Sequence, residues 1–270
     1  MNMEILGYIA SIFMGLSLGL IGGGGSILTV PILVYLFGMN PITATAYSLF
    51  IVGSTALVGG MIYLKKGDVD LKTGFVFAVP SFIAVYLNRA YILPALPDPV
   101  FSIGSLVISK PLLIMLVFAV LMVAASVSMI RTKKIETKKI EFSASSKFLL
   151  IGLEGFVVGT VTGFVGAGGG FLIIPALVIL VGMPMKLAVG TSLFIIAAKS
   201  LIGFTGDLQQ HPVIDWPLIT TITGIAIVGL FVGLYFSKIV SEQALKKGFG
   251  YFVLIMGIFI LFDQIQKTTI

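Results

Sequence analysis

Apolar residues occur along this chain in long runs, which are separated by short polar or glycine-rich stretches. A bilayer core about 30 Å thick needs roughly 20 apolar residues per helix, and the chain offers many runs of suitable length. The pattern predicts an all-α integral membrane protein with about five membrane segments in each half. The predicted segments are 4–21, 26–38, 42–64, 72–88 and 111–130, then 148–165, 170–182, 187–204, 217–237 and 247–262.

The two halves are related to each other in sequence. When the chain is displaced by 144 residues, 19 of the 45 positions from Gly15 to Gly59 are identical, and Pro31 falls on Pro175. Shared hydrophobicity does not place glycine, proline and serine in register, so we interpret the match as an internal repeat. Internal repeats are typical of secondary transporters. The expected units are an N-terminal transmembrane repeat (1–130), a basic cytoplasmic linker (131–147) and a C-terminal transmembrane repeat (148–270).

The basic residues predict how the halves are oriented. With five crossings per half, thirteen of the seventeen Lys and Arg residues lie on one face and three on the other, and Lys199 lies inside a segment. Basic loops favour the cytoplasmic side of a membrane. An odd number of crossings per half then gives repeats of inverted topology, with both termini outside. We expect a multi-pass protein of the cell inner membrane.

Each repeat contains a glycine-rich break, "GLIGGGGSILTVP" (19–31) and "GFVGAGGGFLIIP" (163–175). Such a break predicts a helical hairpin, either re-entrant or fully spanning. A helix that begins just after the glycines presents unpaired N–H groups and a positive dipole end, which suit an anion. Close helix packing is the alternative explanation. The candidate substrate-binding residues in the two breaks are Gly22, Gly23, Gly24, Gly25, Ser26, Gly166, Gly168, Gly169 and Gly170.

Other polar residues inside the segments are further candidates. Lys199 lies about thirteen residues into its segment, where a lysine is costly and is a functional candidate. The alternatives are that it reaches the membrane interface or pairs with Glu154. Arg89 ends the fourth segment, where we expect it to anchor the helix at the interface. The remaining candidates for substrate contact, at equivalent places in the repeat or beside them, are Ser48, Thr191 and Ser192.

Composition narrows the function classes. Hydrophobic residues make up 58% of the chain and charged residues 10%, and the net charge of +6 lies in short loops, so we expect a lipid-embedded protein that binds no nucleic acid. The chain has no cysteine, and its single histidine, His211, lies in a predicted loop, which disfavours an intramembrane enzyme and a metal site. The glycine breaks lack the Lys-Ser/Thr of a phosphate-binding loop. We expect no cofactor.

The paired glycine breaks, each followed by proline, together with "GTSLFIIAAKSLIGF" and "VIDWPL", resemble the sulfite exporter TauE/SafE family over essentially the whole chain. The resemblance implies a bacterial inner-membrane exporter of small sulfur-containing anions such as sulfite, thiosulfate or sulfoacetate. It also implies a coupling ion, either a proton or sodium. A passive anion channel on the same scaffold is the alternative reading.

Overall fold

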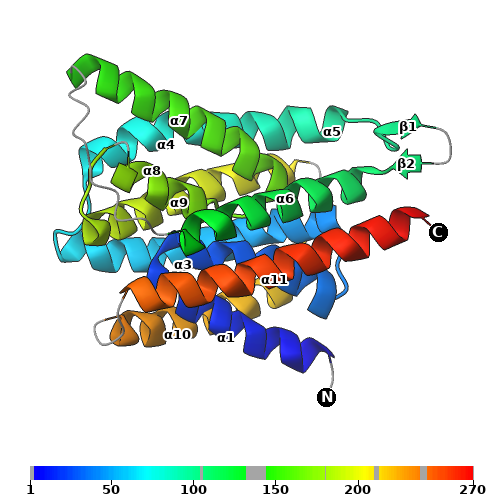
Figure 1. The fold of residues 1–270 in the computed structure, drawn as a ribbon, viewed down its shortest axis with the longest axis horizontal. Helices are drawn as coiled ribbons and strands as arrows, with labels where there is room; N and C mark the ends of the chain where they lie inside the picture. The colour runs from blue at the N-terminus through cyan, green and yellow to red at the C-terminus, as the bar shows by residue number, and fades with distance from the viewer. Residues whose placement is uncertain are drawn as a thin grey trace.

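Eight long apolar helices form the body of the protein (Figure 1). The structure is a computed structural model that describes residues 3–103, 106–131, 144–179, 181–209, 213–237 and 242–269. The eight helices are long and apolar enough to cross a membrane, which confirms the prediction of a multi-pass helical protein. Among the described residues these helices are α1 (Met3–Ile21), α3 (Pro41–Lys65), α4 (Leu71–Leu87), whose span continues through two further short helices to Ala95, α6 (Lys110–Ile130), α7 (Ala144–Val165), α9 (Met185–Leu208), α10 (Trp216–Phe236) and α11 (Glu242–Thr269).

Local sequence signals set where several of these helices begin. The side chain of Asn40 accepts a hydrogen bond from the Ile42 N–H at the start of α3, and Asp70 does the same for Thr73 in α4. Asp215 caps α10 through the Leu218 N–H. These side chains satisfy donors that the first helical turn leaves free, and proline follows directly in α3 because its missing N–H costs nothing there.

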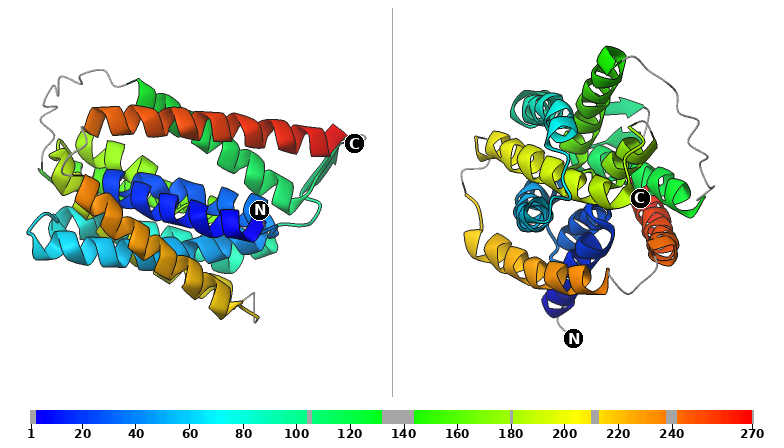
Figure 2. Two further views of the ribbon diagram at one scale, coloured as in Figure 1. Left: turned by 90° about the horizontal axis from the view of Figure 1, so that it is seen from below. Right: turned by 90° about the vertical axis from the view of Figure 1, so that its left-hand side faces the viewer.

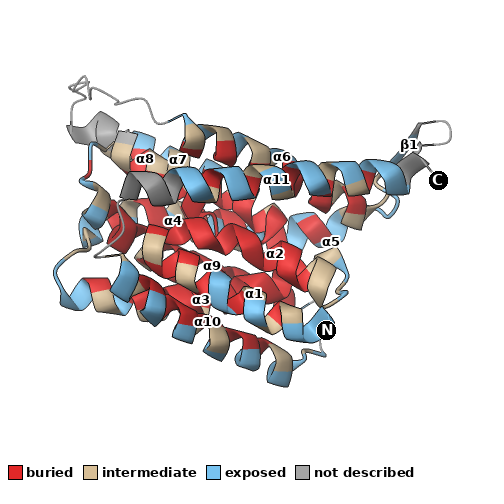
Figure 3. Ribbon diagram, turned by 60° about the horizontal axis from the view of Figure 1, so that its bottom comes forward, coloured by how far each residue is buried: buried red, intermediate tan, exposed pale blue. Residues whose placement is uncertain are grey.

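The helices α3 and α9 form the centre of the protein and pack against each other. They are the most buried of the eight, and Figure 3 shows the buried residues concentrated around them, with exposed residues on the outer helices. Gly53 of α3 lies against Leu201 of α9, whereas Gly60 lies against Phe194. The partner number falls as the α3 number rises, so the two helices run antiparallel.

Glycine stripes bring the outer helices against each other in pairs. A Cβ on Gly15 or Gly19 of α1 would collide with backbone atoms of Ala226 or Leu230 in α10. The Gly155, Gly159 and Gly163 stripe of α7 lies in the same way against α4. These spaced glycines serve close helix packing, because only glycine allows two helix backbones to approach this closely.

Each glycine break leads into a short helical segment, and in the first break this segment begins at Gly23, so the expectation that the helix begins after the glycines is wrong there. The first comprises the 3-10 helix η1 (Gly23–Leu28), α2 (Thr29–Pro31) and the π-helix η2 (Ile32–Leu36), and the second is α8 (Gly170–Ile179). Beyond the first segment, the Phe37 ring packs edge-on against Tyr8, with centroids 5.2 Å apart. The chain therefore returns alongside α1 after the break.

Several features lie outside the predicted pattern. A small antiparallel hairpin, β1 (Phe101–Ile103) and β2 (Leu106–Ile108), follows a π-helix, η3 (Asn88–Ile92), and the short α5 (Leu93–Ala95). Helix α7 begins at Ala144, inside the segment predicted as linker, and residues 132–143 of that linker lie outside the described residues. Both ends of the chain lie at the same end of the molecule (Figure 2).

Candidate functional site

The two glycine breaks meet inside the protein. Gly23 and Gly170 lie with their backbones in direct contact, because a Cβ built on either one would collide with the main chain of the other. All of the residues from Gly22 to Ser26 and from Gly166 to Gly170 are buried. The close backbone contact is therefore sufficient to require glycine at positions 23 and 170, whether or not these residues also bind a ligand.

One face of α3 lies along the second break. Gly166 is packed against Thr45, and a Cβ on Gly168 would lie 2.6 Å from the Val52 Cγ1. Ser48 falls between Thr45 and Val52 on the same helical stripe, since residues three and four apart share a face. The Ser48 hydroxyl is buried and has no hydrogen-bond partner among the described residues. It is therefore a free hydroxyl on the α3 face that borders the break.

Helix α9 lies along the first break in the same manner. A Cβ on Gly22 would lie 2.8 Å from the Val189 Cγ1, and Ile196 packs against Gly23. Ser192 lies between these two positions on the stripe, but its hydroxyl donates to the Val189 carbonyl oxygen at 2.8 Å. The two serines thus occupy equivalent places, and only the Ser48 hydroxyl is left without a partner in the described chain.

Lys199 extends from α9 to the second break. Its side chain is buried, with 1% exposure, and its ammonium donates to the Thr162 Oγ1 at 2.6 Å. A Cβ on Gly169 would lie 2.8 Å from the Nζ atom, so the ammonium sits directly over the glycine turn. Within the described residues Lys199 forms no ion pair with Glu154. Neither the interfacial nor the Glu154-paired alternative therefore describes it.

Thr162 and two other hydroxyl residues were not among the predicted candidates. Thr162 lies one turn before the second break. A polar residue in the otherwise apolar stretch "GTVTGF" (159–164) is the sequence feature that could have identified it as a candidate. Thr29 and Ser200 have buried hydroxyls with no hydrogen-bond partner among the described residues. Unpaired buried hydroxyls are uncommon in folded proteins and suggest that a bound group or water completes them.

The structure separates some predicted residues from the meeting point. The Thr191 hydroxyl accepts a hydrogen bond from the Asp70 N–H at 3.0 Å, so Thr191 supports the start of α4 rather than the breaks. Gly25 lies against the backbone of α1 at Leu18, and Gly24 faces Ile21. Ser26 lies closer to the point where the breaks meet, because a Cβ built on Gly168 would lie 3.1 Å from the Ser26 Cβ.

The expectation that Arg89 anchors a helix at the interface is wrong. Its side chain has 0% exposure, and its Nη1 donates to the Thr45 Oγ1 at 3.1 Å and lies 3.4 Å from the Asp207 Oδ1. The reason is that η3 continues from α4 and turns Arg89 towards α3 and α9. Asp207 lies within α9, and His211 lies outside the described residues.

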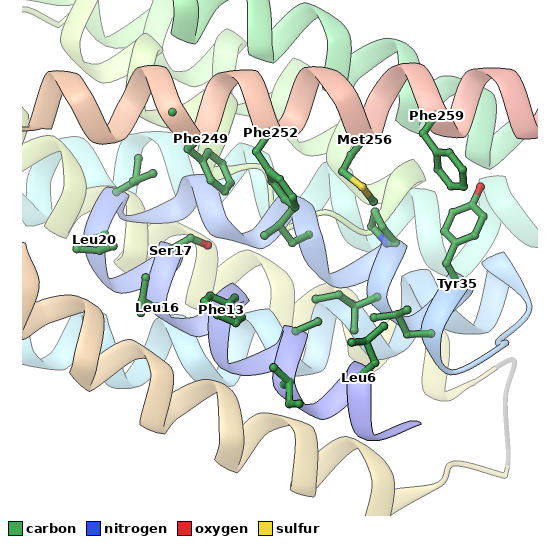
Figure 4. A pocket seen from close by; sticks show the side chains of 18 of the residues that line it. Leu6, Phe13, Leu16, Ser17, Leu20, Tyr35, Phe249, Phe252, Met256 and Phe259 are labelled. Carbon is green, nitrogen blue, oxygen red and sulfur yellow. The ribbon is translucent and has the colours of Figure 1, made fainter. Parts of the chain in front are cut away.

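A large apolar cavity lies elsewhere, between α1, the segment after the first break and α11 (Figure 4). It has a volume of about 1,070 Å³ and is lined by apolar side chains such as Phe13, Phe252 and Phe259, with Ser17 and Tyr35 as its polar members. An anion needs donors or cations to replace its water. This cavity is therefore unsuited to an anion, and the contact between the glycine breaks is the better candidate site.

Comparison with known proteins adds the following. The family model described as sulfite exporter TauE/SafE matches residues 7–260. A probable membrane transporter protein of Xylella fastidiosa is 30% identical, over 92% of this chain and 90% of that protein. The probable membrane transporter protein YdhB of Bacillus subtilis is 24% identical, over 92% of this chain and 96% of that protein. No solved structure matches.

Proposed function

Because the chain belongs to the sulfite exporter TauE/SafE family, as the match over residues 7–260 shows, we propose that it exports small sulfur-containing anions from the cell by secondary transport. The family and the names of the relatives indicate a membrane transporter. Sulfite, thiosulfate and sulfoacetate are the proposed cargo, and a proton or sodium gradient is the proposed driving force. In this proposal the basic loops lie in the cytoplasm and both termini lie outside the inner membrane.

The observation that carries the proposal is the position of Lys199. Among the described residues this buried ammonium forms one hydrogen bond, to Thr162, which leaves two of its three N–H donors for another acceptor, and it lies directly over the backbone of Gly169. An anion beside the Nζ atom would gain a charge-assisted hydrogen bond, which is about twice as strong as a neutral one. The N–H groups of Gly170 and Phe171 at the start of α8 and the Ser48 hydroxyl border the same turn and would add donors, whereas the N–H groups of Leu172 and Ile173 already donate to the Gly169 carbonyl oxygen.

Alternating access between two inverted halves is the proposed mechanism. It is supported by the antiparallel contact of α3 and α9, which occupy equivalent places in the sequence repeat. Two equivalent helices that cross antiparallel are related by an axis perpendicular to them, which is the arrangement of an inverted repeat. The close contact of Gly23 with Gly170 is consistent with a barrier between the two sides, and it argues against a continuously open pore.

The test is uptake of radiolabelled thiosulfate and sulfite into proteoliposomes that contain the full-length protein. We expect saturable transport, and we expect Lys199→Met to abolish most of it while the protein still inserts and purifies normally. Lys186→Met is the matched control, because Lys186 is exposed and pairs with Asp68 in the described structure, away from the glycine breaks. Equal transport by Lys199→Met and the control would contradict the proposed site. Ionic currents in planar bilayers would instead indicate a passive channel.

A further inference from the structure

A second buried cation lies close to the same glycine turn that Lys199 covers. Thr45 packs against Gly166 at the start of this turn, and the Arg89 guanidinium donates to the Thr45 Oγ1. Arg89 comes from η3, Thr45 from α3 and Asp207 from α9, so three separate elements hold the group in place. Such an arrangement differs from a surface arginine, whose long side chain can return to water.

The guanidinium is incompletely satisfied where it lies. Among the described residues, its Nη1 atom alone has hydrogen-bond partners, namely Thr45 and Asp207, and the contact to Asp207 is long at 3.4 Å. Its Nε and Nη2 atoms are buried and find no hydrogen-bond partner within the described ranges. A buried charged group normally has all of its donors paired, because an unpaired donor loses its hydration without compensation. The free edge of Arg89 therefore suggests a missing acceptor.

The two cations gather at one of the two glycine breaks. In the repeat, Lys199 corresponds to Thr55 of the first half. Gly19 and Gly163 are equivalent in the repeat, and they lie against Leu230 and Val85, respectively, so these two partners are equivalent as well. Arg89 lies four residues after Val85, and it therefore corresponds to Leu234, four residues after Leu230. The surroundings of the first break therefore have neutral residues at both of these places. Packing between two related halves does not require cations at one break and neutral residues at the other. Two cations near the second break would, however, favour the binding of an anion there.

Lys199 and Arg89 are also staggered along the membrane normal. Asp207, which pairs with Arg89, lies eight residues after Lys199 on α9, a rise of about 12 Å along the helix. Asp207 is near the end of α9, so Arg89 lies between Lys199 and the face of the protein where α9 ends. An anion that moves from Lys199 towards that face would next meet the guanidinium.

We propose that Arg89, together with the Thr45 hydroxyl, forms a second binding site for the transported sulfur oxyanion, between Lys199 and the outer face. This inference rests on the proposed function and adds a step to it. A planar guanidinium presents paired N–H donors that match two oxygens of a sulfite or thiosulfate ion. The Asp207 carboxylate competes with the anion for Arg89 and occupies part of the guanidinium when the site is empty.

The competing explanation is that Arg89 is retained only as a structural partner of Asp207. The two explanations differ in what removal of the carboxylate does. If the ion pair is structural, Asp207→Asn leaves a buried cation without its counter-charge and weakens the fold, with no gain in anion affinity. If Arg89 binds the anion, Asp207→Asn removes a competitor, and thiosulfate should bind about tenfold more tightly or better.

The experiment measures thiosulfate binding to the purified full-length protein by isothermal titration calorimetry. Chloride, added as its sodium salt, is the control anion. We expect two sites in the unaltered protein and one remaining site in Lys199→Met. We expect that remaining site to disappear in the double variant Lys199→Met/Arg89→Gln. In the Lys199→Met background, Asp207→Asn should lower the dissociation constant about tenfold, and Arg89→Lys should bind more weakly than Arg89 does.

The outcomes separate the two proposals. If the unaltered protein binds no thiosulfate or sulfite, the proposed function fails, and the second site fails with it. If the unaltered protein binds one anion and Lys199→Met binds none, the proposed function survives and the Arg89 site is refuted. Should the Arg89→Gln variant not fold, the Asp207→Asn titration decides, since unchanged or weaker binding in that variant also refutes the site.

Discussion

Replacement of Gly170 by alanine tests the contact between the two glycine breaks. The added Cβ would collide with the Cα, carbonyl carbon and carbonyl oxygen of Gly23. These are main-chain atoms, so the collision cannot be relieved by rotation of a side chain, and α8 or η1 must shift. Overpacking of this kind costs about 1–3 kcal/mol. Alanine gains at most about 1 kcal/mol over glycine in a helix, and less at a first helical residue.

We therefore expect Gly170→Ala to lower the free energy of unfolding by about 1–2 kcal/mol. Gly224→Ala in α10 is the matched control, because a Cβ on Gly224 meets nothing within 4 Å. That variant should be stabilised by up to about 1 kcal/mol. Thermal and denaturant unfolding in detergent micelles, followed by circular dichroism, compares the two. If Gly170→Ala is as stable as Gly224→Ala, the two breaks are not in contact and the reasoning is wrong.

Three further outcomes are expected. Thr162→Val should destabilise the protein by about 1–3 kcal/mol in the same unfolding assay, because it removes the hydrogen-bond acceptor of the buried Lys199 ammonium, whereas Thr162→Ser should restore stability. Lys186→Ala should change stability by less than about 1 kcal/mol, since the lysine side chain of its ion pair with Asp68 is 73% exposed. Because the chain has no cysteine, single cysteines at Asp68 and Val213 can be labelled in intact cells, and labelling of both from the same side would contradict the proposed topology.

Much of the helical framework could be predicted from the sequence. In a bilayer every backbone group must be satisfied within its own segment, so a long apolar run leaves a helix as the only spanning structure. The glycine stripes of α1 and α7 were also interpretable, because their spacing places Gly155 and Gly159 on one face. The burial of Lys199 followed from its depth, since no helix end lies within easy reach of its ammonium.

The environment of Arg89 could not be predicted in the same way. A cation near the end of an apolar segment can reach water by extending its side chain, and sequence alone favours that outcome. The structure differs because η3 adds a π-helical turn after α4, and such turns change which face a residue presents. Thr191 shows the same limit, since its position beside Ser192 suggested the site, while its hydroxyl contacts Asp70.

Magnitudes indicate which feature would dominate anion binding at the second break. A helix N-terminus contributes about 0.3–1 kcal/mol at a surface and up to about 2 kcal/mol where it is partly buried. A unit charge about 4 Å from an anion contributes about 4 kcal/mol at an effective dielectric constant of about 20. The Lys199 ammonium should therefore outweigh the α8 dipole, and the glycines should act chiefly by letting the anion approach it. It follows that Lys199→Met should weaken thiosulfate binding, measured by calorimetry, far more than Gly168→Ala does.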